Sequence, residues 1–186
     1  METIKANTQF GLPVQNIVLD SVQQQYDDTC AIKSQEIIMN AMGFNVTEDS
    51  LRSEAYNNGW YSPGMGTPIE DVGKLMEAHG IQVNSQEGAS LYNLVSELAK
   101  GHPVIVGVDS GELWNPNVDE RFEDMIYGNN GVDHALIVNG INFNDDFTGG
   151  EVSLIDPGTG DFGIGYDLIQ FKDAWDDSGN FMVGIE

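Results

Sequence analysis

Gln24-Gln25-Tyr26-Asp27-Asp28-Thr29-Cys30-Ala31 is the most informative stretch of the chain, because a polar loop turns here into an apolar helix at the only cysteine. Apolar residues recur at near-helical spacing from Thr29 to Met42, and Gly43 follows where a left-handed residue usually ends a helix. Free N–H groups and the dipole at a helix start favour negative charge. A cysteine in this place is therefore suited to serve as a thiolate nucleophile, and a small buried hydrophobe is the alternative.

Two polar residues at the borders of later apolar segments supply candidate partners for Cys30. His134 opens an apolar strand, and Asp156 closes another. An imidazole can take up the proton of a thiol, and a carboxylate can orient that imidazole by accepting its second N–H. His79 and His102 are expected at a helix end and in a turn, where each has a structural explanation. We therefore predict a triad of Cys30, His134 and Asp156.

Each of these assignments has a competing interpretation. His134 could instead be a buried core residue whose ring nitrogens are hydrogen-bonded, and Asp156-Pro157-Gly158 is also an ordinary turn sequence. Asp133 competes for the orienting role, although adjacent residues of a strand point to opposite faces. Gln24 offers a side-chain amide that can donate to a developing oxyanion, while the neighbouring Gln23 and Gln25 leave the choice of glutamine open.

The order of the predicted elements indicates an α+β fold. Helices come first and strands second, which favours an N-terminal helical lobe packed on an antiparallel β-sheet over alternating βαβ units. Thr67-Pro68-Ile69-Glu70 has the pattern of a helix start, with an N-cap hydroxyl, a proline and a capping-box glutamate. Residues 109–133, which include Trp114, are expected to form a long loop, and such loops are often functional. The expected helices cover residues 29–42, 67–80 and 91–100, and the expected strands cover residues 104–108, 134–141, 151–155 and 181–185.

A length of 186 residues with 40% hydrophobic content is enough for one substantial core. Residues 1–22 are expected to form an irregular N-terminal arm with one short apolar stretch at Ile17-Val18-Leu19, and residues 23–186 a single domain. The beginning of the sequence lacks the features of a secretory signal, and no run approaches the ~20 apolar residues that span a bilayer. We therefore expect a protein that is cytoplasmic as synthesised, with leaderless export left open.

The formal net charge is −23, from 30 acidic and 7 basic residues. A uniformly acidic surface repels nucleic-acid phosphates and anionic lipid headgroups, so nucleic acid and membranes are not expected as partners. The same field steers positively charged peptides or proteins toward the molecule. A peptide or protein substrate, basic in character, is the expected partner, and solubility explains the charge equally well.

No cofactor or metal is expected from the sequence. The segment 142–146 resembles the beginning of a calcium-binding loop, but Phe147 occupies the glycine position and Ser153 stands where a glutamate should close the loop. The sequence also lacks a zinc cluster of histidines and cysteines, a phosphate-binding glycine loop and a Gly-x-Ser-x-Gly elbow. With one cysteine, the chain cannot form an internal disulfide.

Several motifs follow one another along the chain: Gln24–Cys30, Gly66-Thr67-Pro68 with its helix to Gly80-Ile81, Gly101–Val106, Asp133–Val138 and Ile155-Asp156-Pro157. In this order they resemble the C39-like group of papain-fold cysteine peptidases, over roughly residues 22–185. The resemblance implies a papain-like cysteine hydrolase fold. It also implies that Cys30 is the nucleophile, His134 the general base, Asp156 the residue that orients the base, and Gln24 part of the oxyanion hole.

The residues around the cysteine depart from the pattern of that group. C39 peptidases usually place an acidic residue before the nucleophile and a glycine after it, whereas this chain has Thr29 and Ala31. Asp27 and Asp28 also place negative charge near the thiol, which opposes a thiolate. One hypothesis is a cysteine peptidase that works through an acyl-enzyme, or an amidase acting on cell-wall peptides or side-chain amides. The other is a non-catalytic papain-fold module that binds or inhibits a partner.

Overall fold

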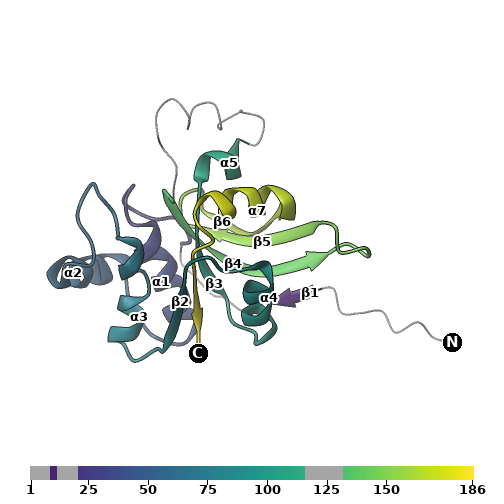
Figure 1. The fold of residues 1–186 in the computed structure, drawn as a ribbon. Helices are drawn as coiled ribbons and strands as arrows, with labels where there is room; N and C mark the ends of the chain where they lie inside the picture. The colour runs from purple at the N-terminus through teal and green to yellow at the C-terminus, as the bar shows by residue number, and fades with distance from the viewer. Residues whose placement is uncertain (1–8, 12–20, 116–131) are drawn as a thin grey trace.

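The computed structural model describes residues 9–11, 21–115 and 132–186, and in these parts helices lie on both sides of an antiparallel sheet (Figure 1). None of the described helices is long and apolar enough to cross a membrane. The helices are α1 (Cys30–Ala41), α2 (Glu48–Asn58), the short 3₁₀ helix η2 (Ile69–Asp71), α3 (Lys74–Ala78), α4 (Leu91–Ala99), α5 (Ser110–Trp114) and α7 (Leu168–Asp177). The strands are β1 (Gln9–Gly11), β2 (Val83–Gln86), β3 (Val104–Val108), β4 (His134–Phe143), β5 (Gly150–Asp156), β6 (Asp161–Asp167) and β7 (Met182–Ile185).

The strands form one sheet in the order β2-β7-β3-β4-β5-β6, and the strand pairs of the described residues are antiparallel. The first half of β4 pairs with β3 and its second half with β1, while β5 lies along its other side. This topology confirms the predicted α+β class with a helical lobe packed on an antiparallel sheet.

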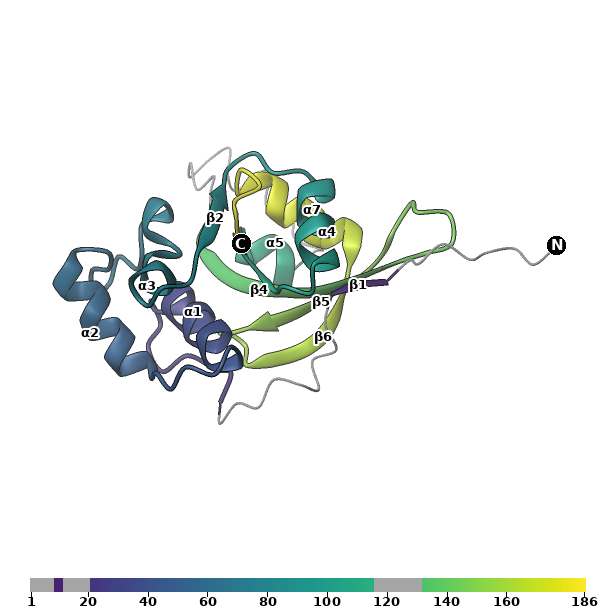
Figure 2. The same cartoon turned by 90° about the horizontal axis from the view of Figure 1, so that it is seen from below.

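Both faces of the central strands are buried, which explains why their sequences are apolar without alternation. One face packs against α1 and α3, with Ile105 and Ile137 in that core. The opposite face packs against α4 and α7, with Val106 and Leu136 in that core. Figure 2 shows α1, α2 and α3 gathered on one side of the molecule, away from α4 and α7. The sheet therefore separates two cores, and the helical lobe contributes to only one of them.

The helix predicted over residues 67–80 is interrupted in the structure. The short helix η2 covers Ile69–Asp71, and α3 begins only after Gly73. Gly73 has a φ of 104°, in the left-handed region that favours glycine, and the Gln35 side chain accepts its N–H at 3.1 Å. The Thr67 hydroxyl caps no helix and has no hydrogen-bond partner among the described residues, so the predicted capping box is wrong.

Several elements are not predicted from the sequence, namely β1, α2, β2, α5, β6 and α7. The polar helix α2 begins with a local cap, in which the Thr47 side chain accepts the Ser50 N–H at 3.2 Å. α5 occupies the start of the predicted loop 109–133, most of which lies outside the described residues. β1 lies in the predicted irregular arm, whose apolar stretch 17–19 is also outside the described residues. The boundary between arm and domain stays a prediction.

Candidate active site

Cys30 is the first residue of α1 and is partly exposed. Thr29 is the N-cap residue, but its side chain makes no hydrogen bond to the first turn, and that turn contains no acidic residue. The first N–H groups of a helix have no partner within it, and the aligned peptide dipoles favour an anion there. The next residues, Ala31 and Ile32, are buried in the core between α1 and the sheet. The Cys30 thiol therefore lies at the start of a helix whose next residues are packed in the core.

The antiparallel register brings His134 and Asp156 together. His134 opens β4 opposite Val108, and three residues further along β4, Ile137 pairs with Ile155 of β5. Asp156 is the next and last residue of β5, so the chain turns beside His134. His134 Nε2 lies 2.7 Å from Asp156 Oδ1. The histidine is 7% exposed and the aspartate is fully buried, so water barely reaches this bond.

Asp156 is a buried anion with three hydrogen-bond donors. His134 and the Gly158 N–H, at 2.8 Å, donate to Oδ1, and the indole Nε1–H of Trp114 donates to Oδ2 at 3.1 Å. Burial raises the pKa of a carboxyl group, but these donors and the charge of His134 hold the pKa of Asp156 below its usual value. The side chain therefore stays ionised and can orient the imidazole.

His134 interacts with both Asp156 and Cys30. Burial lowers the pKa of His134, but hydrogen bonds to Asp156 and Cys30, together with the charges of these groups, raise it to about 9. Because Asp156 occupies Nε2, Nδ1 is the ring nitrogen left for the thiol. The structure thus places His134 between the Asp156 carboxylate and the Cys30 thiol.

Trp114 and Gly158 enclose the His134–Asp156 pair. The ring centroids of Trp114 and His134 lie 5.2 Å apart, with the planes tilted by 55°. A Cβ atom at Gly158 would lie 3.0 Å from His134 Cε1 and 3.3 Å from Asp156 Oδ1, so a side chain there would push the imidazole. From the sequence, Gly158 is only a turn residue and Trp114 only part of a long loop. The one hint is that long ordered loops are often functional.

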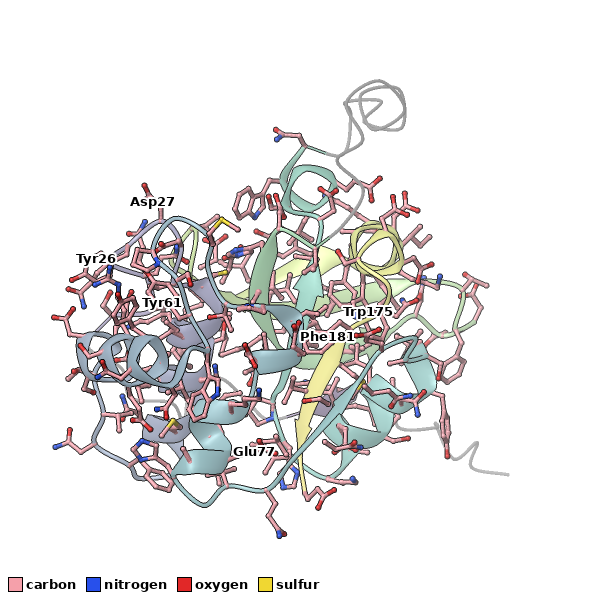
Figure 3. All side chains as sticks on the ribbon, turned by 60° about the vertical axis from the view of Figure 1, so that its left-hand side comes forward. Tyr26, Asp27, Tyr61, Glu77, Trp175 and Phe181 are labelled. Atoms are coloured by element: carbon pink, nitrogen blue, oxygen red, sulfur yellow. The ribbon has the colours of Figure 1, made fainter. Side chains whose placement is uncertain are left out.

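A cleft of about 310 Å³ lies over Cys30 and His134. Ile69 from the helical lobe, Val132 and Phe181 contribute to its apolar lining. Phe181 lies toward the middle of the molecule in Figure 3, between the lobe and the helix that carries Trp175. A cleft of this volume with mixed apolar and polar walls is suited to bind part of an extended ligand.

Acidic side chains also line the cleft. Asp28 accepts hydrogen bonds from the Tyr61 hydroxyl at 2.9 Å and the Gly64 N–H at 2.6 Å, so it holds the loop beside the cleft. Asp27 is exposed and lies on the outside of the helical lobe in Figure 3. The negative charge predicted beside the thiol is therefore present, and one of its two carboxylates is engaged in fixing a loop.

The other candidates of the sequence have different partners. Asp133 accepts the N–H and the hydroxyl of Ser110, each at 2.8 Å. His79 Nε2 lies 3.0 Å from a carboxylate of α2, and His102 Nδ1 lies 3.0 Å from a backbone carbonyl of β7. Among the described residues, no group of three or more His, Cys, Asp or Glu side chains could hold a metal ion.

Gln24 lies beside the turn that follows Asp156. Its N–H donates to the Pro157 carbonyl at 2.9 Å, and its Nε2 donates to the Tyr26 carbonyl at 2.6 Å. A side-chain amide has two N–H donors, so one is left for a further acceptor. Gln24 does not appear among the described residues that line the cleft, and its oxyanion role stays a prediction.

Solved structures of C39 peptidases share this architecture. A putative C39-like peptidase from Bacillus anthracis matches with a TM-score of 0.67 at 13% identity, over 96% of this chain and 97% of that chain. The peptidase domain of Streptococcus ComA, a bi-functional ABC transporter of a quorum sensing pathway, gives 0.61 at 15% identity, over 89% and 96%. A double glycine motif protease from an AMS/PCAT transporter, in complex with the leader peptide, gives 0.53 at 15% identity, over 91% and 92%.

These similarities establish the fold and confirm the predicted papain-like architecture. None of the curated proteins compared with the chain matches it. A family model, that of the Peptidase_C39 like family, matches residues 16–182, which is most of the sequence. The predicted resemblance is therefore confirmed, and this chain belongs to the Peptidase_C39 like family.

Proposed function

We propose that the protein is a cysteine peptidase in which Cys30 is the nucleophile, His134 the general base and acid, and Asp156 the residue that orients it. One observation carries the proposal. His134 donates to the fully buried Asp156 across 2.7 Å while it interacts with Cys30 at the start of α1. Acyl transfer by a cysteine requires a nucleophile next to a base, and a further group that orients the base; Cys30, His134 and Asp156 are proposed for these three roles.

The reaction would follow from the charges of these groups. The Cys30 thiolate attacks the carbonyl carbon of the substrate, and the His134 imidazolium protonates the departing amine, which leaves a thioester. Neutral His134 then takes a proton from water, and the resulting hydroxide attacks the thioester, which releases the acid product and restores the Cys30 thiolate beside protonated His134. The second N–H of Gln24 Nε2 and the uncapped N–H groups at the start of α1 are the proposed donors to the oxyanion.

A basic peptide is the proposed substrate. Asp27 and Asp133 line the cleft, and the net charge of −23 attracts cations from a distance. The apolar lining contributed by Ile69 and Phe181 favours an apolar side chain next to the basic one. A bound leader peptide is described for one structural neighbour, which supports a peptide as the kind of ligand. An amidase that hydrolyses side-chain amides with the same residues is the alternative form of this proposal.

Peptide digestion tests this proposal directly. We would incubate the protein with a defined library of unstructured peptides, with and without lysine and arginine, and identify new termini and deamidated products by mass spectrometry. Cleavage that prefers basic peptides and is abolished in Cys30→Ala is the expected result. Deamidation without new termini would select the amidase. Binding of peptides without any product, in both the wild type and Cys30→Ala, would select the non-catalytic module.

A further inference from the structure

Glu48 is a buried carboxylate that the proposed reaction does not use. It is the first residue of α2 and is 1% exposed. Its two carboxylate oxygens accept the Gln25 N–H at 3.0 and 3.1 Å, and Oε1 also accepts the Thr29 hydroxyl at 2.6 Å. Gln25 and Thr29 are adjacent to Gln24 and Cys30 in the sequence. Glu48 therefore bonds to both ends of the segment 25–29, which connects the proposed oxyanion donor to the proposed nucleophile.

Two positive features lie next to Glu48, the start of α2 and Lys33. The position of Glu48 in the first turn of α2 places it at the positive end of the helix dipole. Lys33 Nζ lies 3.9 Å from its Oε2 and 2.9 Å from Glu36 Oε2, and the lysine itself is 5% exposed. Glu48 is therefore fixed by several partners and accepts hydrogen bonds from both Gln25 and Thr29.

Glu48 also contacts the N-cap residue of α1. A threonine at an N-cap position normally accepts an N–H of the first turn. The Thr29 hydroxyl instead contacts Glu48 and the Tyr26 carbonyl, at 2.6 and 2.9 Å, and makes no cap hydrogen bond. The first N–H groups of α1, beginning with that of Cys30, have no acceptor from the Thr29 side chain.

We propose that Glu48 is a positioning residue for this site, which rests on the proposed function of Cys30. It fixes the Thr29 hydroxyl and the Gln25 N–H. In this way it holds the segment next to Cys30 so that the sulfur stays directed toward His134. Glu48 acts through Thr29 and Gln25 and does not touch the reacting atoms.

Alkylation of Cys30 by iodoacetamide at pH 6.5 tests this role without a substrate. Displacement of a reacting group by about 1 Å can cost about 100-fold in rate, so we expect Glu48→Ala to slow alkylation by about 10- to 100-fold. Glu48→Gln, which keeps one acceptor oxygen and the side-chain shape, should fall between Glu48→Ala and the wild type. If Glu48 acts through Thr29, Thr29→Val should slow the reaction too, and the double variant should be no slower than Glu48→Ala.

Asn40→Ala is the matched control for loss of stability. Asn40 makes two hydrogen bonds of 3.0 Å to the backbone of Val46 and so holds the connection between α1 and α2. Its loss should lower the melting temperature and leave the alkylation rate unchanged. If Asn40→Ala and Glu48→Gln slow the alkylation of Cys30 equally, the proposal is overturned, because both effects would then reflect a general loss of stability of the helical lobe.

The sign of the effect separates positioning from simple charge repulsion. A negative charge near a thiol opposes the thiolate, so removal of a merely repulsive Glu48 would speed alkylation at pH 6.5. Slower alkylation supports positioning, and faster or unchanged alkylation contradicts it. Failure of the proposed function looks different, because the wild type itself would then react no faster than an ordinary thiol.

Discussion

Replacement of Asp156 by asparagine removes the charged acceptor of His134 and keeps the shape of the side chain. In the wild type, this bond is 2.7 Å long and almost wholly shielded from water. A hydrogen bond to a charged group contributes about 1.5–3 kcal/mol, and about 1.4 kcal/mol corresponds to one pH unit in a pKa. We therefore expect Asp156→Asn to lower the pKa of His134 from about 9 to about 7–8.

Proton NMR of the imidazole C–H groups measures this pKa directly. The chain has 3 histidines, so the His134 resonances can be assigned by comparison with His134→Gln. Asp133→Asn is the matched control, because Asp133 is adjacent in sequence but bonds to Ser110. Its change should leave the pKa of His134 near 9. A pKa that stays at about 9 in Asp156→Asn, or falls equally in both variants, would refute the assignment of Asp156 as the orienting residue.

Three further predictions concern the same pair. Gly158→Val should slow the alkylation of Cys30 and lower the free energy of unfolding by about 1–3 kcal/mol. The reason is that a Cβ atom at this position would lie 3.0 Å from His134 Cε1. If the alkylation rate and the free energy of unfolding both stay at their wild-type values, the imidazole is not displaced. Trp114→Phe should lower the free energy of unfolding, measured in urea, by about 1–3 kcal/mol, because the buried Oδ2 of Asp156 loses its indole donor. An unchanged urea midpoint would contradict this. The raised pKa of His134 adds stability that is complete below about pH 6.5 and is lost as pH rises through about 9. The free energy of unfolding should therefore fall more steeply between pH 7 and 10 in the wild type than in His134→Gln, and parallel curves would argue against the raised pKa.

The sequence predicts those parts of the site that are set by local rules. Cys30 begins a helix because a polar segment meets an apolar periodic one, and this boundary is visible in the residues themselves. His134 and Asp156 lie at the borders of apolar strands, and antiparallel pairing then brings the borders together. The expected helix starting at residue 91 and the strand 104–108 follow from the same periodicity and are confirmed.

The parts that sequence reasoning misses depend on contacts between distant residues. Trp114 reaches Asp156 across 42 positions, and Glu48 reaches Gln25 across 23, which no local pattern encodes. α2 escapes prediction because only a few of its residues are buried, so its apolar periodicity is weak. The residues from Thr67 to Glu70 match the sequence pattern of a capping box, but the left-handed Gly73 interrupts the helix that this pattern predicts.

The most direct test of the thiolate–imidazolium pair is the rate of Cys30 alkylation by iodoacetamide from pH 4 to 9, in the wild type and in His134→Ala. Cys30 is the only thiol of the chain, so the signal has one source. An ordinary free thiol loses its reactivity below about pH 8.5. We predict that the wild type stays reactive well below this pH and that His134→Ala does not. A wild-type profile like that of an ordinary thiol, or one that His134→Ala leaves unchanged, would contradict a thiolate–imidazolium pair.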